Sequence, residues 1–394
     1  MTNRALLLSA LAAMLWSLPA TMIAAQLPRM VTVLYADQAS DPFYANARGY
    51  AGIYSNAART PFPAAELAIT DAKLVGEAVG MLFTLKHLTI DAGADTTGAI
   101  AKALDADPAA AVLLDLPADA MLKAASELKD RPVVLFNARH QDNGLRQSAC
   151  GTHLFHTMPS TDMLEDALAQ GLAKRNWKRV LTVSGEDPVD RALSAAFKTS
   201  ADKFGLTITA AKTFVPGTDP RDRDRNNPRL ITAEADYDVV FVADHQGDFA
   251  RYLPYNTLLP RPVVGAAGLM PSAWHPYWER QGAPQLNRRF EKTAKRLMTD
   301  LDWSAWAAVR AIVEATVRGK PGGDLSTGLL DPALTLELYK GVPGSFRPWN
   351  RQLRQPLLLG SQTVVAGTAP VDGMLHRSNT LDTLGLDEPE FRCP

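Results

Sequence analysis

Short apolar strands alternate with helical patterns along most of this chain. The strand candidates are continuous runs rich in β-branched residues, and the clearest cover 30–35, 110–114, 132–136, 179–183, 238–242 and 262–265. Helical spacing of apolar residues marks the segments between them, including 64–74, 97–105, 118–129, 162–175 and 191–204. Continuous apolar strands separated by helices predict parallel sheets that are covered by helices on both faces.

The strand and helix patterns fall into two series, which predicts an α/β fold with two lobes, each a mostly parallel sheet flanked by helices. The length of 394 residues also exceeds what one hydrophobic core usually supports. We expect interleaved lobes, with the first made of 26–155 and 270–330 and the second of 156–269 and 331–394. The stretch 270–319 is expected to contain helices and no strands, whereas 335–339 and 356–366 are strand-like.

The first 25 residues have the layout of a secretory signal peptide. A positive start at 1–4 precedes an almost wholly apolar run at 5–22, and small residues then lead to Ala25. A retained membrane anchor is the alternative, but the apolar run is of borderline length for a span and Pro19 interrupts it. We therefore expect cleavage after Ala25 and a soluble protein exported to the periplasm.

The charge balance limits the classes of binding partner, and the cysteine content predicts a disulfide. The 41 basic and 42 acidic residues nearly balance, which argues against nucleic acid and against an anionic lipid surface as partners. Cys150 and Cys393 are the two cysteines, and an even count in an oxidising compartment predicts one disulfide between them. Two unpaired thiols are the alternative.

The motifs of common enzyme classes are absent from the sequence. There is no Gly-x-Ser-x-Gly elbow, no phosphate-binding Gly-x-x-x-x-Gly-Lys loop and no Gly-x-Gly-x-x-Gly fingerprint. His153 and His156 would point to opposite faces of a strand, so they cannot share a metal ion. We expect no catalytic residues, no catalytic cofactor and no metal site.

An exported two-lobed α/β chain of this kind resembles the periplasmic substrate-binding proteins of ABC transporters. The segment 153–162, His-Leu-Phe-His-Thr-Met-Pro-Ser-Thr-Asp, is similar to the lobe-switching segment of the branched-chain amino-acid receptor type, although His156 stands where an arginine is common there. The resemblance implies a type I periplasmic-binding-protein fold. It also implies a small-molecule ligand, an ABC permease in the inner membrane as partner, and a monomer.

The C-terminal part carries a narrower resemblance. The motifs Trp303–Arg310 (WSAWAAVR), Trp349–Pro356 (WNRQLRQP) and Leu381–Gly385 (LDTLG) look like those of a sub-family that accompanies alcohol oxidation dependent on pyrroloquinoline quinone, PQQ. This resemblance implies PQQ as a bound ligand. Receptors for an aromatic acid or an amino acid, a non-transport sensor and a periplasmic enzyme remain the alternatives.

Ligands of open α/β sheets bind beyond the carboxyl ends of the strands, so the turns that follow the strands supply candidate ligand contacts. These candidates are Asp37, Asp115, Asn137, Arg139, Arg146, Glu186, Asp187, Asp244, Trp274 and Trp278. Arg139 would grip a carboxylate with two hydrogen bonds, and tryptophan faces would flank a planar anionic ligand. The alternatives are helix caps and solvated turns for the polar residues, and core positions for the two tryptophans.

Overall fold

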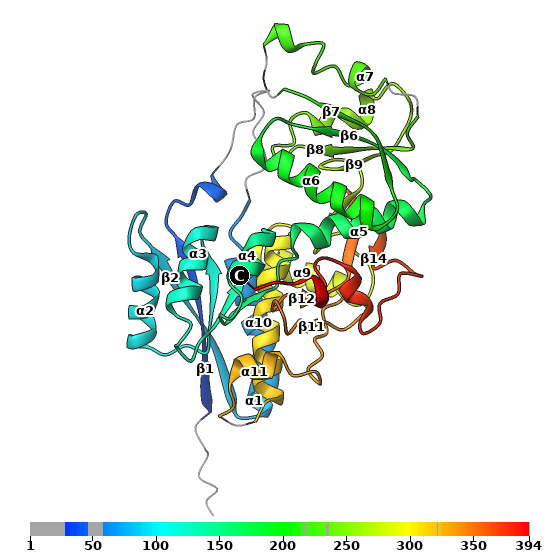
Figure 1. Cartoon of the computed structure of the whole chain (residues 1–394). Helices are drawn as coiled ribbons and strands as arrows, with labels where there is room; N and C mark the ends of the chain where they lie inside the picture. Colours follow the sequence, from blue (N-terminus) through cyan, green and yellow to red (C-terminus); the bar gives the residue numbers. More distant parts are fainter. Residues whose placement is uncertain are drawn as a thin grey trace, which may run out of the picture.

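Two lobes lie one above the other in the computed structural model, which describes residues 28–45, 58–215, 217, 219–233, 236–320 and 322–393 (Figure 1). The predicted signal peptide, 1–25, lies outside the described residues. Within the described ranges, no helix has the length and apolar character needed to cross a membrane.

The first lobe is built on a five-stranded parallel sheet with the order β2-β1-β3-β4-β5. Its strands are β1 (Arg29–Gln38), β2 (Met81–Ile90), β3 (Ala111–Asp115), β4 (Val134–Asn137) and β5 (Leu154–His156). Every residue of β3 and β4 is buried, as the continuous apolar runs predict for strands covered on both faces.

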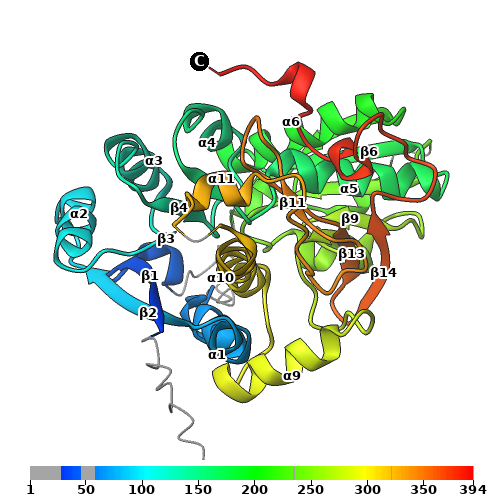
Figure 2. The same cartoon turned by 90° about the horizontal axis from the view of Figure 1, so that it is seen from below.

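Helices cover both faces of this sheet, and Figure 2 shows them on opposite sides. One face packs against α1 (Phe62–Ala78) and α10 (Asp300–Arg318), and the other against α2 (Thr96–Ala106), α3 (Ala118–Glu127) and α4 (Asn143–Ser148). Two core clusters result, one on each face.

The second lobe repeats this design with four parallel strands in the order β7-β6-β8-β9. The strands are β6 (Arg179–Ser184), β7 (Thr207–Thr213), β8 (Val239–Ala243) and β9 (Val263–Gly265). The helices of this lobe are α5 (Thr161–Lys174), α6 (Pro188–Lys203) and the short α7 (Pro228–Ile231) and α8 (Leu253–Asn256). The two-lobed α/β fold predicted from the sequence is thus confirmed.

A three-stranded antiparallel sheet packs on α5, the first helix after the chain passes from β5 of the first lobe into the second lobe. Its order is β10 (Met270–Ser272), β13 (Leu357–Ser361) and β14 (Val364–Ala369). The presence of β10 corrects the expectation that 270–319 holds no strand. A three-residue strand carries no readable periodicity, and its pairing partner is β13, far along the chain.

The elements that follow β10 include the helices α9 (Ala283–Ala294) and α11 (Leu325–Leu329), and the two-stranded hairpin of β11 (Ser345–Phe346) and β12 (Leu353–Arg354). The strand-like pattern at 335–339 forms a single bridge between Leu336 and Gly344 rather than a strand.

The C-terminal range 331–394, expected in the second lobe, divides its packing between both lobes. Leu336, Phe346 and Leu353 are buried in the core cluster of the first lobe. Leu359 and Leu384 pack instead against α5. This part of the chain therefore joins the lobes.

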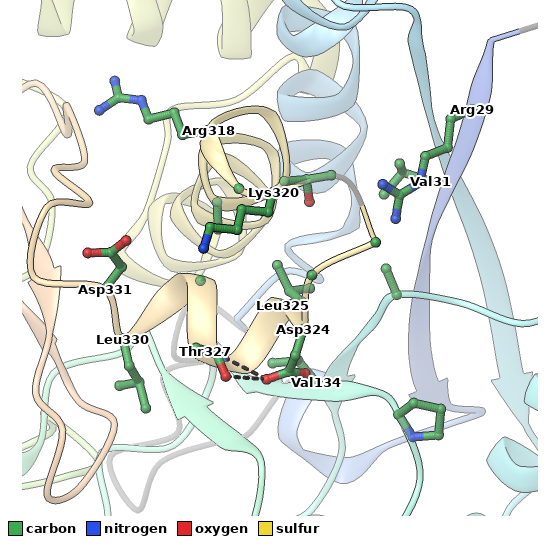
Figure 3. Close-up of a pocket in the computed structure, with 18 residues that line it drawn as sticks. Arg29, Val31, Val134, Arg318, Lys320, Asp324, Leu325, Thr327, Leu330 and Asp331 are labelled. Atoms are coloured by element: carbon green, nitrogen blue, oxygen red, sulfur yellow. Dashed lines mark hydrogen bonds between the residues drawn. The ribbon is translucent and has the colours of Figure 1, made fainter.

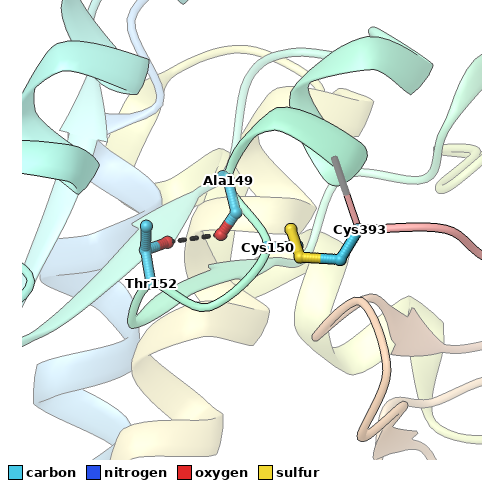
Figure 4. Close-up of a disulfide and its surroundings, with 4 residues drawn as sticks. All are labelled: Ala149, Cys150, Thr152 and Cys393. Atoms are coloured by element: carbon cyan, nitrogen blue, oxygen red, sulfur yellow. Dashed lines mark hydrogen bonds between the residues drawn. A yellow bond between two sulfur atoms is a disulfide. The ribbon is translucent and has the colours of Figure 1, made fainter.

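The predicted disulfide is present. Cys150 follows α4 in the first lobe and is bonded to Cys393 near the C-terminus, with the two Cα atoms 5.8 Å apart (Figure 4). The bond joins residues that are separated by 243 positions in the sequence.

Candidate ligand-binding site

The carboxyl ends of the first-lobe strands lie on the side of that lobe that faces the second lobe (Figure 1). Asp37 and Asp115 are paired across β1 and β3 at these ends, and Asn137 is the last residue of β4. Parallel strands finish at one edge of a sheet, which is why residues so far apart in sequence meet there.

Arg139 lies at the centre of this edge. Its side chain is only 4% exposed, and Nη1 donates hydrogen bonds to Asp41 at 2.7 Å and to Asp115 at 3.3 Å. The ring of Phe43, in the short 3-10 helix η1 (Pro42–Tyr44), lies 4.1 Å from the guanidinium carbon. Arg139 is therefore already paired with two buried carboxylates, which the sequence did not predict.

The two carboxylates differ in their titration. Although burial alone raises the pKa of Asp41, hydrogen bonds from Arg139 and from a backbone amide bring it below its usual range. Burial raises the pKa of Asp115 despite hydrogen bonds from the hydroxyls of Tyr35 and Tyr44, both 2.6 Å long. Asp41 therefore ionises at a lower pH than Asp115 does, and it is the more readily charged of the two carboxylates beside Arg139.

One edge of the Arg139 guanidinium is still open. Within the described part of the chain, neither Nε nor Nη2 has a hydrogen-bond partner, and Nε is buried. The Nε–Nη2 edge has the geometry that binds a carboxylate with two parallel hydrogen bonds. Nη1 donates to both Asp41 and Asp115, which fixes the orientation of the guanidinium and of its Nε–Nη2 edge.

Asp37 is also at this edge but has a different partner. Its Oδ2 lies 2.7 Å from His87 Nε2, while its buried Oδ1 has no hydrogen-bond partner among the described residues. The His87 ring stacks on Phe62, with centroids 4.3 Å apart. Asp37 Oδ1 is therefore a buried oxygen at this edge of the sheet that has no partner in the described part of the chain.

Asn137 shapes the turn that presents Arg139. The fully buried amide accepts from the backbone N–H groups of Arg139 and His140 at 3.0 and 2.8 Å, and it donates to the His140 carbonyl at 2.9 Å. Its side chain is thus used within the protein, and its role is to position Arg139.

Arg146, expected as a ligand contact, has no open nitrogen. Nε donates to Gln352, Nη1 to the carbonyls of His140 and Asp142, and Nη2 to the Met158 carbonyl, at 2.7–3.0 Å. Burial lowers its pKa to about 9. These bonds tie α4 to Met158, between β5 and α5, and to Gln352, in the β11–β12 hairpin.

The expected contacts of the second lobe are mostly turn-forming groups. Asp187 caps α6 by accepting from the Val189 amide at 2.8 Å, and Asp244 accepts from three backbone amides of the following turn. The exposed Glu186 pairs with Arg225 at 2.9 Å. Asp187 is therefore a helix cap and Asp244 a turn-forming residue, as the alternative to a ligand contact predicted for both.

Sequence reasoning missed a pairing of an aspartate with a histidine in the second lobe. Asp190 is buried and accepts from both Nδ1 and the backbone N–H of His245, at 2.8 and 2.7 Å. Asp190 lies in the first turn of α6, where carboxylates are common because they interact favourably with the helix N-terminus. Its position in the sequence therefore gave no indication of the contact with His245.

Trp274 and Trp278 occupy the core of the first lobe. The Trp274 ring stacks on Trp303 with centroids 6.1 Å apart, and its Nε1 donates to Asn287 at 2.9 Å. Trp278 is buried as well and donates to the Tyr339 carbonyl at 3.0 Å. Both tryptophans are therefore core residues, as the alternative to a ligand contact predicted.

The aromatic groups that do lie beside Arg139 were missed. Phe43 and Tyr44 follow β1 in η1, with ring centroids 4.1 and 5.4 Å from the guanidinium carbon. The pair Asp41–Pro42 is the sequence signal that could have found this turn, because an N-cap aspartate before proline starts a helix.

A large cavity lies at the opposite end of the first lobe. It has a volume of about 1020 Å³ and is lined by the amino ends of β1 and β4, the end of α10, and α11 (Figure 3). Arg29 and Lys320 contribute to its lining, and Asp324 is held by the Thr327 hydroxyl. Because ligands of open α/β sheets bind at the carboxyl ends of the strands, we place the candidate site at Arg139 instead.

Comparison with solved structures shows the same fold in ABC transporter receptors. A substrate-binding protein from Desulfitobacterium hafniense in complex with leucine has a TM-score of 0.61 and 17% identity, covering 86% of this chain and 98% of that one. A branched-chain amino-acid transporter protein from Burkholderia xenovorans has a TM-score of 0.65 and 13% identity, covering 86% and 95%. A solute-binding protein from R. palustris in complex with benzoate has a TM-score of 0.56 and 13% identity, covering 86% and 96%.

Sequence comparison identifies the family. A search of curated proteins gave no significant match. The profile of the family described as periplasmic binding protein matches residues 50–254, just over half of the chain. Proteins of this family are transport receptors rather than enzymes. The two-lobed fold and the profile agree, and the chain belongs to the periplasmic binding protein family.

Proposed function

We propose that this protein is the periplasmic receptor of an ABC importer and that it binds a small organic carboxylate between its lobes. The observation that carries the proposal is the open Nε–Nη2 edge of Arg139, a buried cation at the carboxyl ends of the first-lobe strands. Cleavage after Ala25, a monomeric state and delivery of the ligand to an inner-membrane permease are parts of the same proposal.

An aromatic acid or an amino acid is the ligand class with the most support. Structural relatives are described in complex with leucine and with benzoate. Phe43 and Tyr44 beside Arg139 favour an aromatic acid, because aromatic rings pack well against one another and exclude water from a neighbouring ion pair.

PQQ is a second candidate, supported by the sub-family resemblance of the C-terminal motifs. It is planar and carries carboxylates, so the Arg139 edge would suit one of them. A sensor that passes a ligand signal to a protein partner would share the fold and the site. A permease and an ATPase encoded beside the gene would favour transport.

The carboxylate is tested by thermal unfolding of the purified protein with benzoate, phenylalanine, leucine and PQQ. We expect benzoate or another aromatic acid to stabilise the protein, by about 2.7 kcal/mol at a concentration 100 times its Kd. Benzamide is the matched control, because it has the same ring and shape without the negative charge. Equal stabilisation by benzamide and benzoate, or none by any carboxylate in the panel, would overturn the proposal.

A further inference from the structure

The C-terminal segment 371–393, here called the strap, begins on the second lobe. The Val371 amide donates to Gln170 of α5 at 3.1 Å, and Gln170 in turn donates to Thr383 at 3.1 Å. The Gly385 amide donates to Asp166 of α5 at 2.7 Å, and the side chain of Leu384 is fully buried against the same helix. The strap is therefore fixed to α5 at three points along its length.

A buried ion cluster holds the middle of the strap. Asp382 is fully buried and accepts from Arg347 Nε and Arg354 Nε, both at 2.8 Å. Arg347 also donates to the carbonyls of Leu381 and Leu384. Arg347 directly follows β11 and Arg354 ends β12, in the hairpin that packs with the first lobe, so the middle of the strap is bonded to this hairpin as well as to α5.

The far end of the strap is bonded to the other lobe. Cys393 lies eight positions beyond Gly385, and a chain of that length reaches at most about 29 Å when fully extended. It is not extended, because Asp387 and Glu390 form a capping box and Asp387 also pairs with His376 at 3.0 Å. The strap ends at Cys150, which follows α4 of the first lobe.

The strap lies beside a contact between the lobes that includes hydrogen bonds, with Leu386 next to Asn143 and Asp162. Asn143 of α4 donates to Asp162 of α5 at 2.7 Å, and the Thr161 amide donates to the Gln141 carbonyl at 2.8 Å. Opening of the lobes in this fold is a hinge motion that breaks and remakes such bonds. The disulfide next to α4 is covalent and does not break in that motion.

We propose that the strap is a covalent limit on the opening of the two lobes. It keeps α4 of the first lobe close to the start of α5 of the second, so the hinge can rotate only as far as the segment between Gly385 and Cys393 allows. A limit of this kind narrows the range of open states from which a ligand is captured and lowers the entropy that closure must overcome. The inference concerns the lobes alone and holds for any ligand.

The first test is small-angle X-ray scattering of the protein without added ligand, before and after reduction with dithiothreitol. We expect the radius of gyration and the maximum dimension to increase on reduction, with an unchanged circular dichroism spectrum. The variant Cys150→Ser/Cys393→Ser should match the reduced protein and should not respond to dithiothreitol. Identical scattering of the oxidised and reduced protein would overturn the proposal.

Hydrogen exchange separates a limit on opening from general stabilisation. On reduction and alkylation, the amides at the α4–α5 contact, above all Thr161, should exchange at least several-fold faster, while amides in β3 and β6 keep their rates. If β3 and β6 exchange faster by the same factor, the disulfide stabilises the whole fold instead and the proposal is wrong. Failure here would leave the carboxylate site at Arg139 unaffected, because the two tests use different readouts.

Discussion

Replacing Arg139 with methionine is expected to destabilise the protein by about 3–5 kcal/mol, because it leaves two buried carboxylates without their cation. Asp41 and Asp115 are each 4% exposed and both accept from Arg139 Nη1. Urea unfolding of Arg139→Met against the unmutated protein measures the change. The position of Arg139 after a strand would by itself predict a ligand contact whose loss leaves stability unchanged. Because of its two ion pairs, we expect a loss of stability instead.

The variant Arg139→Lys separates the structural role of this residue from its binding role. Lysine keeps a positive charge for Asp41, so most of the stability should return. It cannot offer two parallel N–H donors, so binding of the carboxylate should remain weak. An Arg139→Met protein as stable as the original would show that the ion pairs contribute little. Full carboxylate binding by Arg139→Lys would remove the Nε–Nη2 edge from the site.

Replacing Glu165 with glutamine is expected to stabilise the protein in alkaline solution. Glu165 is 4% exposed on α5, and its buried Oε2 has no partner among the described residues. Burial, together with the nearby charges of Asp166 and Asp162, raises its pKa from 4.5 to about 8. Between these two pH values the folded protein holds a proton that the unfolded chain has released, so stability falls as pH rises.

Glutamine cannot ionise, so Glu165→Gln should lack this part of the pH dependence. The variant and the original should be equally stable near pH 4.5, and the variant should be more stable above pH 8, by on the order of 4 kcal/mol. Unfolding free energies measured from pH 4.5 to 9 test the expectation. Parallel stability curves across that range would contradict it.

Asp300→Asn is the matched comparison. Burial raises the pKa of Asp300 to about 6, against a hydrogen bond from the Trp274 amide. The loss of stability that accompanies ionisation of Asp300 in the original protein is therefore complete near pH 6. The difference in unfolding free energy between Asp300→Asn and the original should stop growing there. If both variants depart from the original over one common pH range, the two carboxyl groups are not the source of the effect.

Local patterns in the sequence were sufficient to predict the elements and their class. The expected strand 110–114 corresponds to β3 (Ala111–Asp115), and 179–183 corresponds to β6 (Arg179–Ser184). Trp303 and Trp306 are buried, as their helical spacing predicts. These features depend on apolar periodicity over a few residues, which a single chain displays directly. The disulfide followed from an even cysteine count, without geometry.

The partners of the site residues were decided only by the tertiary structure. Arg139 meets Asp41 across 98 positions, and Trp274 stacks on Trp303 in the core instead of facing a ligand. Strand ends predict which side chains share an edge, but not which of them neutralise one another there. The pairing of Arg139 depends on the fold of the turn 41–44, which places Asp41 beside it. It also depends on burial, because a buried charge without a partner costs free energy that an internal ion pair offsets. Local sequence patterns therefore determined the lobes, while packing decided that Arg139 pairs with Asp41 and Asp115 and leaves its Nε–Nη2 edge without a partner among the described residues.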